Sequence, residues 1–532
     1  MKKTKRILSA ALAAVLLATA AAGCQKSEQG AANGKTVIVG AATDLKTLDT
    51  GYMYEVYGNM VSYSLYDMLF RIEGEDMSNP KPSLVTDKWT LDETGTIYTL
   101  PIREGVKFSS GNPLTAADVV WSIQRVMGLK DSSNQAHVAG IQSVEAKDDH
   151  TVVITLKAPD ASYLTKLASN AYCILDSKLV KENGGSTEAG TIYTLPIREY
   201  LNKNSAGSGP FILESWTPEN ELSMKKNPNY WGSAGNVERV VIKEYDDANT
   251  QIQALEKGEI DIALSVNSDN VAQLKGKDGV TIKNAQAAVC SFLLMNNDPA
   301  IGKEMANPKV QQAVRYAIDY EGLKKMCGEG ASLPLSIVPQ GFVGAKNRPD
   351  NYRNLDKAKA LMKEAGYENG FTVELTAANF DTEGMKWPDI AQKIQADLKE
   401  IKIDVKIVTS EFSVMVDPYR KGELPFLVMH WSPDYFDINN QLAFLPGSTV
   451  GERAKWAADG HQDMIDLGNK IIGESDKTLR AQYSEQLQDL MAENSPYAFL
   501  LQHPKVYAYR TNLSNVSYCD LCKIQLKDLT VN

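Results

Sequence analysis

The chain has 532 residues, more than one ordinary domain holds, so two or three lobes are expected. Apolar residues make up 43% of the sequence and charged residues 23%, which is the balance of a soluble globular protein. The formal net charge of −10, without a basic patch or stripe, excludes nucleic acid as an expected partner.

The N-terminus has the pattern of an export signal. MKKTKR supplies positive charge, an apolar run of small residues follows, and AAGC ends at Cys24. The apolar run is too short for a good membrane span. AAGC resembles a bacterial lipobox, whose Cys becomes the lipid-modified first residue, although Ala21 stands where Leu is usual. We predict a lipoprotein signal peptide at 1–23, lipidation at Cys24, and a flexible tether at 24–35.

No other stretch is apolar enough to cross a membrane. The mature protein is therefore expected outside the cytoplasm, lipid-anchored to the cell membrane on its periplasmic side or outer face. The alternative is ordinary cleavage beside an incidental cysteine.

Five cysteines follow Cys24, so at least one is unpaired. Cys519 and Cys522 form a lone CxxC, which is a weak signal for redox chemistry or metal binding. Zinc would need a second pair of ligands, and none is near in the sequence. We predict a local structural role or a disulfide for Cys519 and Cys522.

In the first half of the chain, β-branched and aromatic runs between turn residues predict strands, and apolar residues at helical spacing predict helices. Expected strands lie at 35–40, 96–102, 106–108, within 144–156 as a pair, within 205–230 as a pair, at 237–244 and at 259–263. Expected helices lie at 60–70, from Thr115 to 127 with Thr115 as the cap, and at 247–257.

The second half alternates strands with helices, which is α/β in character. Strands are expected at 291–296, 371–376, 403–408 and 497–509. Helices are expected at 308–326 with Pro in the first turn, at 356–365 ended by Gly366, at 390–400, and over most of 464–491.

The decapeptide GTIYTLPIRE occurs twice, at 95–104 and 190–199. Repeat proteins repeat whole supersecondary units at least three times, so this pair does not define the architecture. The flanking sequences differ completely, GVKFSSGNPL after the first copy and YLNKNSAGSG after the second.

Several motifs in order resemble those of the family 5 extracytoplasmic solute-binding proteins, which are the oligopeptide, dipeptide and nickel binding components of ABC importers. The match runs from about residue 35 to about 510. The segments that carry it are YTLPIREGVKFSSGNPLTAADVVWSIQR (98–125), NSAGSGPF (204–211), NPNYW (227–231), GEIDIA (258–263), NPKVQQAVRYAIDYEGL (307–323), DKAKALMKEAGY (356–367) and HWSPDYFD (430–437).

The resemblance implies an α/β, two-lobed periplasmic-binding-protein type II fold with an extra, mainly β subdomain in the first lobe. Lobe I is then expected at 36–289, with the β-rich subdomain at about 63–200. Lobe II is expected at 290–495, and residues 496–532 return to lobe I.

The resemblance also separates the two decapeptides. The first copy falls in a strand of the family, whereas the second falls in a variable connection. We predict a strand for the first copy and irregular or short extended structure for the second, because Pro196 would break a helix and residues 192–194 prefer extended backbone. The second copy is assigned no ligand role.

A binding protein of this kind does no covalent chemistry, so no catalytic residue, metal or cofactor is expected. Its two lobes close about a hinge, and a ligand that touches both stabilises the closed state. The implied partners are a permease and ATPase complex in the membrane, and the protein itself is expected to be a monomer.

Asp434 and Trp431 are the main candidates for ligand contact. The resemblance implies that the Asp of W-x-x-D pairs with a peptide α-amine, because an ammonium taken out of water needs a carboxylate partner. Trp431 can supply apolar area or stack on a ligand group. The alternative is a packing Trp and an Asp that caps a turn. Asp437 matches a second acid of the family, although Ile438 stands where Pro often follows.

The class of ligand stays open between several solutes. Dipeptide-binding relatives place an Arg in the stretch that is TAANFDTEGMKWPD here, and Lys386 is its only cation. We therefore expect oligopeptides, with an oligosaccharide or another small solute as the alternative. Nickel is disfavoured, because the five histidines show no close ligand spacing. A sensor on the same fold remains open, and a secreted hydrolase lacks its sequence motifs.

Overall fold

The computed structural model describes residues 35–42, 45–55, 57–245 and 247–532. The predicted signal peptide, Cys24 and the predicted tether up to residue 34 lie outside the described residues. Within the described ranges, no helix is long and apolar enough to cross a membrane.

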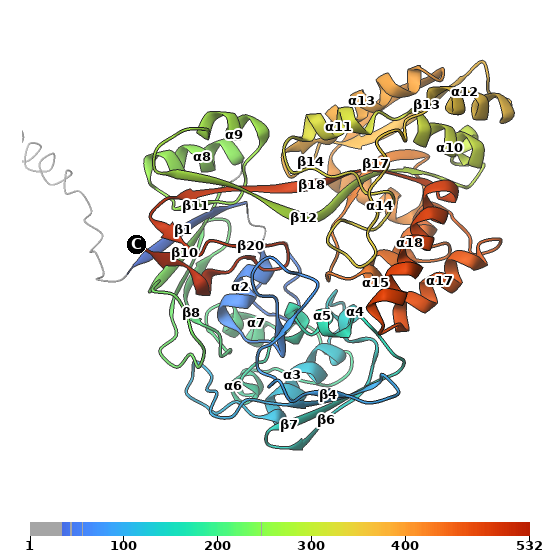
Figure 1. Cartoon of the computed structure of the whole chain (residues 1–532). Coiled ribbons are helices and arrows are strands. Elements are labelled where there is room, and N and C mark those ends of the chain that lie inside the picture. The colour runs from blue at the N-terminus through green and yellow to red at the C-terminus, as the bar shows by residue number, and fades with distance from the viewer. Residues whose placement is uncertain (1–34, 43–44, 56, 246) are drawn as a thin grey trace, which may run out of the picture.

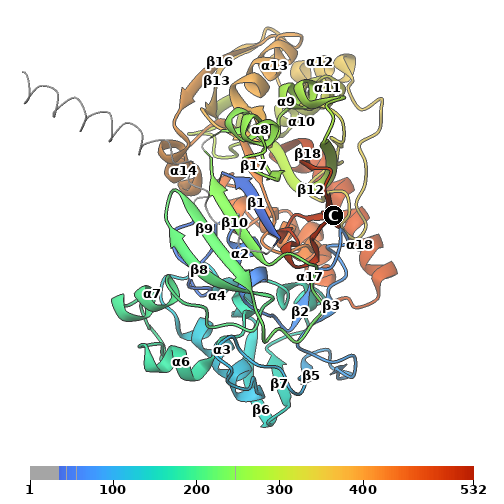
Figure 2. The same cartoon turned by 90° about the vertical axis from the view of Figure 1, so that its left-hand side faces the viewer.

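The largest sheet among the described residues has ten strands (Figure 1), in the order β16-β13-β17-β12-β18-β11-β1-β10-β9-β8. Figure 2 shows its β1, β8, β9 and β10 end. The strands are β1 (Thr36–Ala41), β8 (Phe211–Thr217), β9 (Glu221–Lys226), β10 (Arg239–Glu244), β11 (Ile262–Ala263), β12 (Val280–Met295), β13 (Phe371–Ala378), β16 (Ile403–Ser410), β17 (Phe426–Trp431) and β18 (Tyr497–Arg510).

The two long strands β12 and β18 join the two halves of this sheet. They pair antiparallel, and their register shifts between Gln286 and Cys290. The end of β12 from Cys290 onward also pairs with β17, whereas the far end of β18 pairs with β11. We call the elements before β12 and after β18 the first lobe, and those between them the second lobe. The predicted limits at 289–290 and 495–496 fall inside β12 and just before β18, and as lobe boundaries they stay predictions.

The first lobe carries a separate antiparallel sheet at its base (Figure 1), in the order β4-β5-β7-β6. Helix α3 (Ala116–Gly128) accompanies it, and the Asp118 carboxylate accepts from the backbone N–H of Thr115 at 3.0 Å, so the predicted helix start is confirmed. Residues 106–108, predicted as a strand, form one isolated bridge at Lys107. The strands are β4 (Thr90–Leu91), β5 (Ile97–Pro101), β6 (Ile141–Asp148) and β7 (Thr151–Leu156).

The second lobe has the predicted strand, helix, strand order, since β13 and β16 pair in parallel across helix α13. The single helix predicted over 308–326 is wrong, because the chain leaves helical geometry at Ile318 and Asp319 starts a new helix by accepting from Gly322 N–H at 3.0 Å. The helices are α10 (Pro308–Ala317), α11 (Tyr320–Cys327), α12 (Leu355–Glu364), α13 (Trp387–Lys399), α14 (Phe412–Lys421), α17 (Gln462–Gly473) and α18 (Lys477–Asn494).

Shorter elements complete the described chain. The helices are α2 (Gly58–Leu65), α4 (Gln135–Val138), α5 (Tyr163–Lys166), α6 (Ser177–Glu182), α7 (Leu195–Leu201), α8 (Ala248–Lys257), α9 (Ser268–Leu274), α15 (Ile438–Gln441) and α16 (Thr449–Arg453). The short strands are β2 (Phe70–Arg71), β3 (Lys81–Pro82), β14 (Asp381–Thr382), β15 (Met385–Lys386), β19 (Leu513–Ser514), β20 (Tyr518–Cys519), β21 (Lys523–Ile524) and β22 (Thr530–Val531).

The two decapeptides have different structures. The first contains strand β5, as predicted. The prediction of irregular or extended structure for the second is wrong from Leu195 onward, where helix α7 begins. Pro196 does not break this helix because it lies in the first turn, where its missing N–H has no intrahelical partner to lose.

The CxxC near the C-terminus forms a disulfide between Cys519 and Cys522, so the predicted local bond is present. Both residues are buried. Cys173, Cys290 and Cys327 are free.

Candidate functional site

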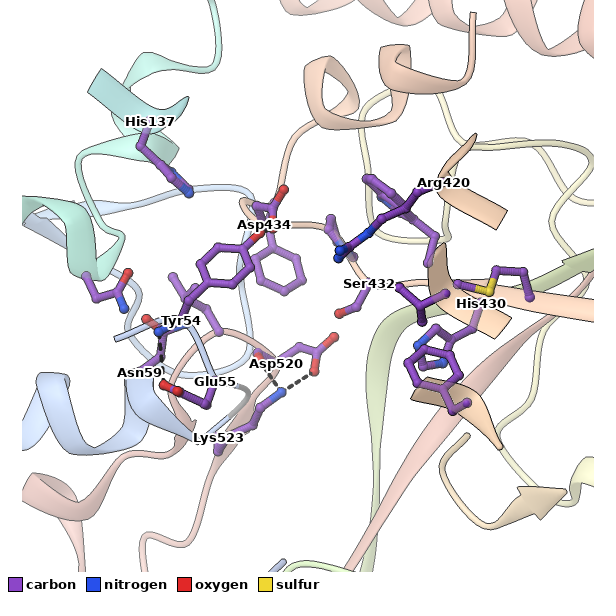
Figure 3. A pocket seen from close by; sticks show the side chains of 18 of the residues that line it. Tyr54, Glu55, Asn59, His137, Arg420, His430, Ser432, Asp434, Asp520 and Lys523 are labelled. Carbon is purple, nitrogen blue, oxygen red and sulfur yellow. Dashed lines mark hydrogen bonds and ion pairs between the residues drawn. The ribbon is translucent and has the colours of Figure 1, made fainter. Parts of the chain in front are cut away.

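A cavity of about 480 Å³ lies between the two lobes, and we call it the main cavity (Figure 3). Both lobes supply its walls, so it has the position that a ligand holding the lobes together would need. The first lobe contributes Tyr54, Glu55, Asn59, His137, Asn170, Asp520, Leu521 and Lys523, and the second lobe contributes Phe412, Val416, Tyr419, Arg420, Met429, His430, Trp431, Ser432, Pro433, Asp434, Phe436 and Arg453.

The segment 430–437 enters this cavity because strand β17 ends there. Strand β17 lies between β13, with which it is parallel, and β12. The chain leaves β17 at Trp431 and reaches helix α15 at Ile438, and the loop between them forms part of the wall. Loops at the carboxyl ends of strands are the usual ligand sites of open α/β sheets. The strand therefore positions the loop, and the loop presents Asp434.

Asp434 is contacted from both lobes. One carboxylate oxygen accepts from the Tyr54 hydroxyl of the first lobe, and the other accepts from Asn440 Nδ2 at 3.3 Å. Burial and the Asp434 carboxylate raise the pKa of Tyr54, so the phenol stays a hydrogen-bond donor. Among the residues that the structure describes, no cation forms an ion pair with Asp434. Its negative charge is thus available to a ligand.

Trp431 is half-buried in the same wall. Its ring packs edge-on against Phe444 with 5.3 Å between centroids, and its Nε1 donates to Asn440 Oδ1 at 3.2 Å. Asn440 is buried, so one amide orients both Trp431 and Asp434. The indole is held in place by packing while it also lines the main cavity.

Asp437 does not line the main cavity. Its carboxylate accepts from both terminal nitrogens of Arg480, at 2.8 Å for Nη1 to Oδ2. It also accepts from the backbone N–H of Asn439 at 2.9 Å at the start of α15. Asp437 and Arg480 are both buried. The predicted ligand contact of Asp437 stays a prediction, although both carboxylate oxygens already have partners.

Five charged residues of the main cavity escaped the sequence analysis, namely Glu55, Arg420, Arg453, Asp520 and Lys523. Arg420 is exposed on α14 and has no ion-pair partner within the described ranges. Glu55 accepts from the Tyr54 backbone N–H at 3.1 Å and likewise pairs with no cation there. Figure 3 shows Arg420 across the cavity from Glu55. Lys386, the cation that sequence reasoning considered, does not line the cavity.

A sequence signal for Arg420 exists on helix α14. The residues of this helix that line the main cavity are spaced four, three and one positions apart, which puts them on one helical face. They are Phe412, Val416, Tyr419 and Arg420. The spacing predicts a common face, but not that the face is turned toward a ligand cavity. Glu55 carries no comparable signal.

The two histidines of the main cavity are neutral near pH 7. Burial lowers the pKa of His137 to about 4 and that of His430 to about 4. His430 Nδ1 lies 2.7 Å from Thr382 Oγ1 and His137 Nδ1 lies 3.3 Å from Ser169 Oγ. No group of three His, Cys, Asp or Glu side chains able to hold a metal occurs among the described residues.

The segment that carries the Cys519–Cys522 disulfide lines the main cavity with Asp520, Leu521 and Lys523, and we call it the floor of the cavity. Lys523 Nζ pairs with Asp520 Oδ1 at 2.9 Å, and Asp520 Oδ2 accepts from the Ala288 N–H at 2.8 Å. Ala288 lies where the ladder of β12 and β18 is interrupted. The floor is therefore attached directly to the strand crossing between the lobes, and its two charges neutralise each other.

The model of the bacterial extracellular solute-binding proteins, family 5 Middle, matches residues 79–452, more than half of the chain. The chain belongs to this family. Its extracytoplasmic location and its class as a binding protein follow from the family. The matched range ends inside the second lobe and contains Trp431, Asp434 and Asp437.

Relatives cover most of the chain. The dipeptide-binding protein of Escherichia coli K12 is 27% identical over 451 residues, 80% of this chain and 81% of its own. Heme-binding protein A of Haemophilus influenzae is 26% identical over 468 residues, 82% of each chain. A periplasmic binding protein of Helicobacter pylori, solved with the peptide STSA, superposes with a TM-score of 0.75 at 24% identity, covering 94% of this chain and 98% of its own. The predicted two-lobed type II fold is confirmed.

Proposed function

We propose that this protein is the substrate-binding component of an ABC importer that captures peptides in the main cavity. Its mature form is anchored through a lipid on Cys24, acts as a monomer, and delivers the ligand to a permease and ATPase complex. The observation that carries the proposal is Asp434, a carboxylate without a cationic partner among the described residues, at an interlobe cavity.

Asp434 suits a peptide α-ammonium for two reasons. An ammonium removed from water needs a carboxylate and further acceptors, and Asp434 offers both oxygens in fixed positions. Arg420 supplies the opposite charge in the same cavity, which suits a terminal or side-chain carboxylate. These anchors recognise groups common to all peptides, so side chains are free to vary. A dipeptide-binding relative is consistent with this chemistry.

Tyr54 couples the ligand to the lobes. It reaches from the first lobe to Asp434 of the second, so the two lobes share a hydrogen bond at the point where the ammonium is proposed to bind. A bound ammonium would add a charged partner to the same carboxylate and favour the arrangement in which the lobes meet. Asp437 and Arg480 have a structural role in this proposal, since they fix the start of α15.

The first experiment is a thermal-shift and calorimetry screen of the mature protein from Gln25 onward. The probes are mixed peptides of two to eight residues, oligosaccharides, hemin and Ni²⁺. Binding to the native state raises the melting temperature by mass action. Asp434→Asn is expected to weaken peptide binding about 10- to 100-fold, because a charged hydrogen bond contributes about 1.5–3 kcal/mol. Asp417→Asn, an exposed position on α14 outside the cavity, is the matched control.

A ligand variant makes the test specific to the α-amine. N-acetylation of the peptide removes its ammonium, so it should weaken binding to wild type as much as Asp434→Asn does and add little more in that variant. Arg420→Gln should weaken peptides with a free C-terminus more than their amides. A shift with oligosaccharides or hemin alone, unaffected by Asp434→Asn, would overturn the peptide proposal. Cys24→Ser, which removes the acceptor of the lipid, should move the protein from the membrane fraction to the soluble fraction.

A further inference from the structure

A second cavity of about 530 Å³ opens between the lobes beyond the main one. The first lobe lines it with residues of the base sheet and of the loop and helix around α5, and the second lobe lines it at the junction of α17 and α18. Its residues include Trp89, Tyr98 and Leu164 on one side and Gly473, Ser475 and Lys477 on the other. Like the main cavity, it therefore has walls from both lobes.

One short segment links the two cavities. Asp434 lines the main cavity, Asp437 lines the second, and Phe436 lines both. Three residues of extended chain span at most about 10 Å. An extended ligand held at Asp434 would therefore reach the second cavity within about four residues of its N-terminus.

A seam of interlobe contacts lies beside the second cavity, whose lining includes Asp160 and Ala161. The backbone N–H of Ala161 donates to Ile472 O at 2.8 Å, and Asn439 Nδ2 donates to Asp160 Oδ1 at 3.1 Å. Lys166 Nζ lies 4.8 Å from the centre of the Tyr435 ring. These contacts join the first-lobe loop around α5 to the segment that follows Asp434 and to the end of α17.

Phe436 is the side chain at this seam that faces both cavities. It is buried, and its ring packs edge-on against Phe342 with 6.0 Å between centroids. An aromatic ring in such a position limits what passes between the cavities unless it turns aside or is shortened.

The second cavity suits the later residues of a peptide rather than another charged terminus. Trp89, Tyr98 and Leu164 give it apolar surface on which varied side chains can pack. Two of its inner carboxylates are already paired, Asp437 with Arg480 and Asp160 with Lys166. The charged residues Glu93 and Lys477, which form no such pair within the described ranges, are exposed at its rim.

We infer that the second cavity is a subsite for the C-terminal part of peptides of about five residues or more, and that Phe436 sets the length at which it is entered. The inference rests on the proposed function, because it places the N-terminus at Asp434. Dipeptides and tripeptides remain in the main cavity and do not contact the subsite.

The test fills the second cavity without touching the main one. Ser475→Trp places a large ring at its edge from an exposed position. Calorimetry with Ala/Ser peptides of two, three, five and eight residues, all with the same first two residues, should show at least a tenfold loss for the five- and eight-residue peptides. The shorter two should change less than twofold. Thr478→Trp, also exposed but outside both cavities, should change none of them.

Phe436→Ala should favour long peptides, whereas Ser475→Trp should weaken their binding. Phe436→Ala should raise the affinity for eight-residue relative to two-residue peptides by fivefold or more; if this variant does not fold, the Ser475→Trp comparison decides. Peptide binding in which Ser475→Trp affects all lengths alike, or none, would overturn the inference and leave the proposed function standing. Absence of binding at every length in the wild-type protein would overturn the proposed function itself, and the inference with it.

Discussion

Residues 95–104 and 190–199 have the same sequence and different structures. In the first copy Ile97–Pro101 is strand β5, whereas in the second Leu195–Leu201 is helix α7 (Figure 2). Both copies begin with a glycine in the left-handed region, Gly95 at φ 71° and Gly190 at φ 81°. The shared residues therefore set the same entry turn, and the surroundings of each copy decide whether strand or helix comes after it.

The first copy is a strand because partners are available on both sides. Strand β7 pairs with it along its length, opposing Tyr98 to Ile154 and Leu100 to Val152, and β4 pairs on its other edge. Tyr98 and Leu100, two residues apart on one face of the strand, are both buried. Gly105 then takes a φ of 77° and ends the extended run.

The second copy is a helix because of the residues that come after it. Tyr200 and Leu201 extend the helix by about half a turn, so Ile197 and Leu201 fall four residues apart on one buried face. No strand pairs with this copy among the described residues beyond a single bridge at Thr191. Leu195, equivalent to the fully buried Leu100, is 55% exposed. Leu100 and Leu195 are thus expected to contribute differently to the free energy of unfolding, although they are the same residue of the repeated sequence.

The largest expected difference is at these two leucines. Leu100→Ala should lower the free energy of unfolding by about 2–5 kcal/mol, because it removes buried methyl groups and leaves a cavity. Leu195→Ala should change it by less than about 0.5 kcal/mol. Urea unfolding of both variants beside wild type measures this. Equal losses would mean that the exposed helix start of the second copy is covered by a surface not present in this structure.

The fold was predictable where local pattern and tertiary context agree. The strand, helix, strand order of 371–408 rests on clear periodicity, and the structure confirms it. The division of 308–326 was missed because the break depends on an Asp cap that competes with continuous helical spacing. The helix of the second decapeptide was missed because a proline that breaks a helix interior is tolerated in a first turn, and the ten residues alone do not say where the helix begins.

The site was predictable only in part, because some of its residues share one sequence motif and others are brought together only by the fold. Trp431 and Asp434 belong to one motif, so sequence reasoning could find them together, and both line the main cavity. Glu55 comes from a segment nearly 380 residues away and is brought there by the fold alone. The partner that engages Asp437 is Arg480, 43 residues further on, and sequence spacing gave no sign of it.

At the two glycines we expect a loss of stability that is smaller than that of Leu100→Ala and the same in both copies. Gly95→Ala and Gly190→Ala should each cost about 1–2 kcal/mol, because an L-residue is strained in the left-handed region. The added methyl group has space at both sites, since its nearest neighbour at Gly95 is Pro159 at 3.5 Å and none lies within 4 Å at Gly190. Thermal unfolding compares the two variants. A loss at one copy alone would show that the entry turn, too, depends on its surroundings.

The smallest predicted loss of stability should be greater in the second copy than in the first, opposite to the result expected for the leucines. The Tyr193 hydroxyl bonds to Thr47 Oγ1 and lies 3.4 Å from Asn202 Oδ1, which also accepts from Leu48 N–H at 2.8 Å. Tyr193→Phe should therefore cost about 1 kcal/mol. The Tyr98 hydroxyl has no hydrogen-bond partner within the described part of the chain, so Tyr98→Phe should cost less than about 0.5 kcal/mol.

Denaturant titration of the two Phe variants measures this difference. Thr47→Val removes the same bond from the other side, together with the bond that Thr47 Oγ1 donates to Asn202 Oδ1 at 3.2 Å and the one it accepts from Asp49 N–H at 3.0 Å. Thr47→Val and Tyr193→Phe should not add when combined. Additive losses would mean that the hydroxyl of Tyr193 acts through Asn202 alone. Because residues 47–48 lie just before Tyr54 and Glu55 of the main cavity, a loss of peptide affinity in Tyr193→Phe without a matching loss in Tyr98→Phe would connect the second copy to the site through this loop.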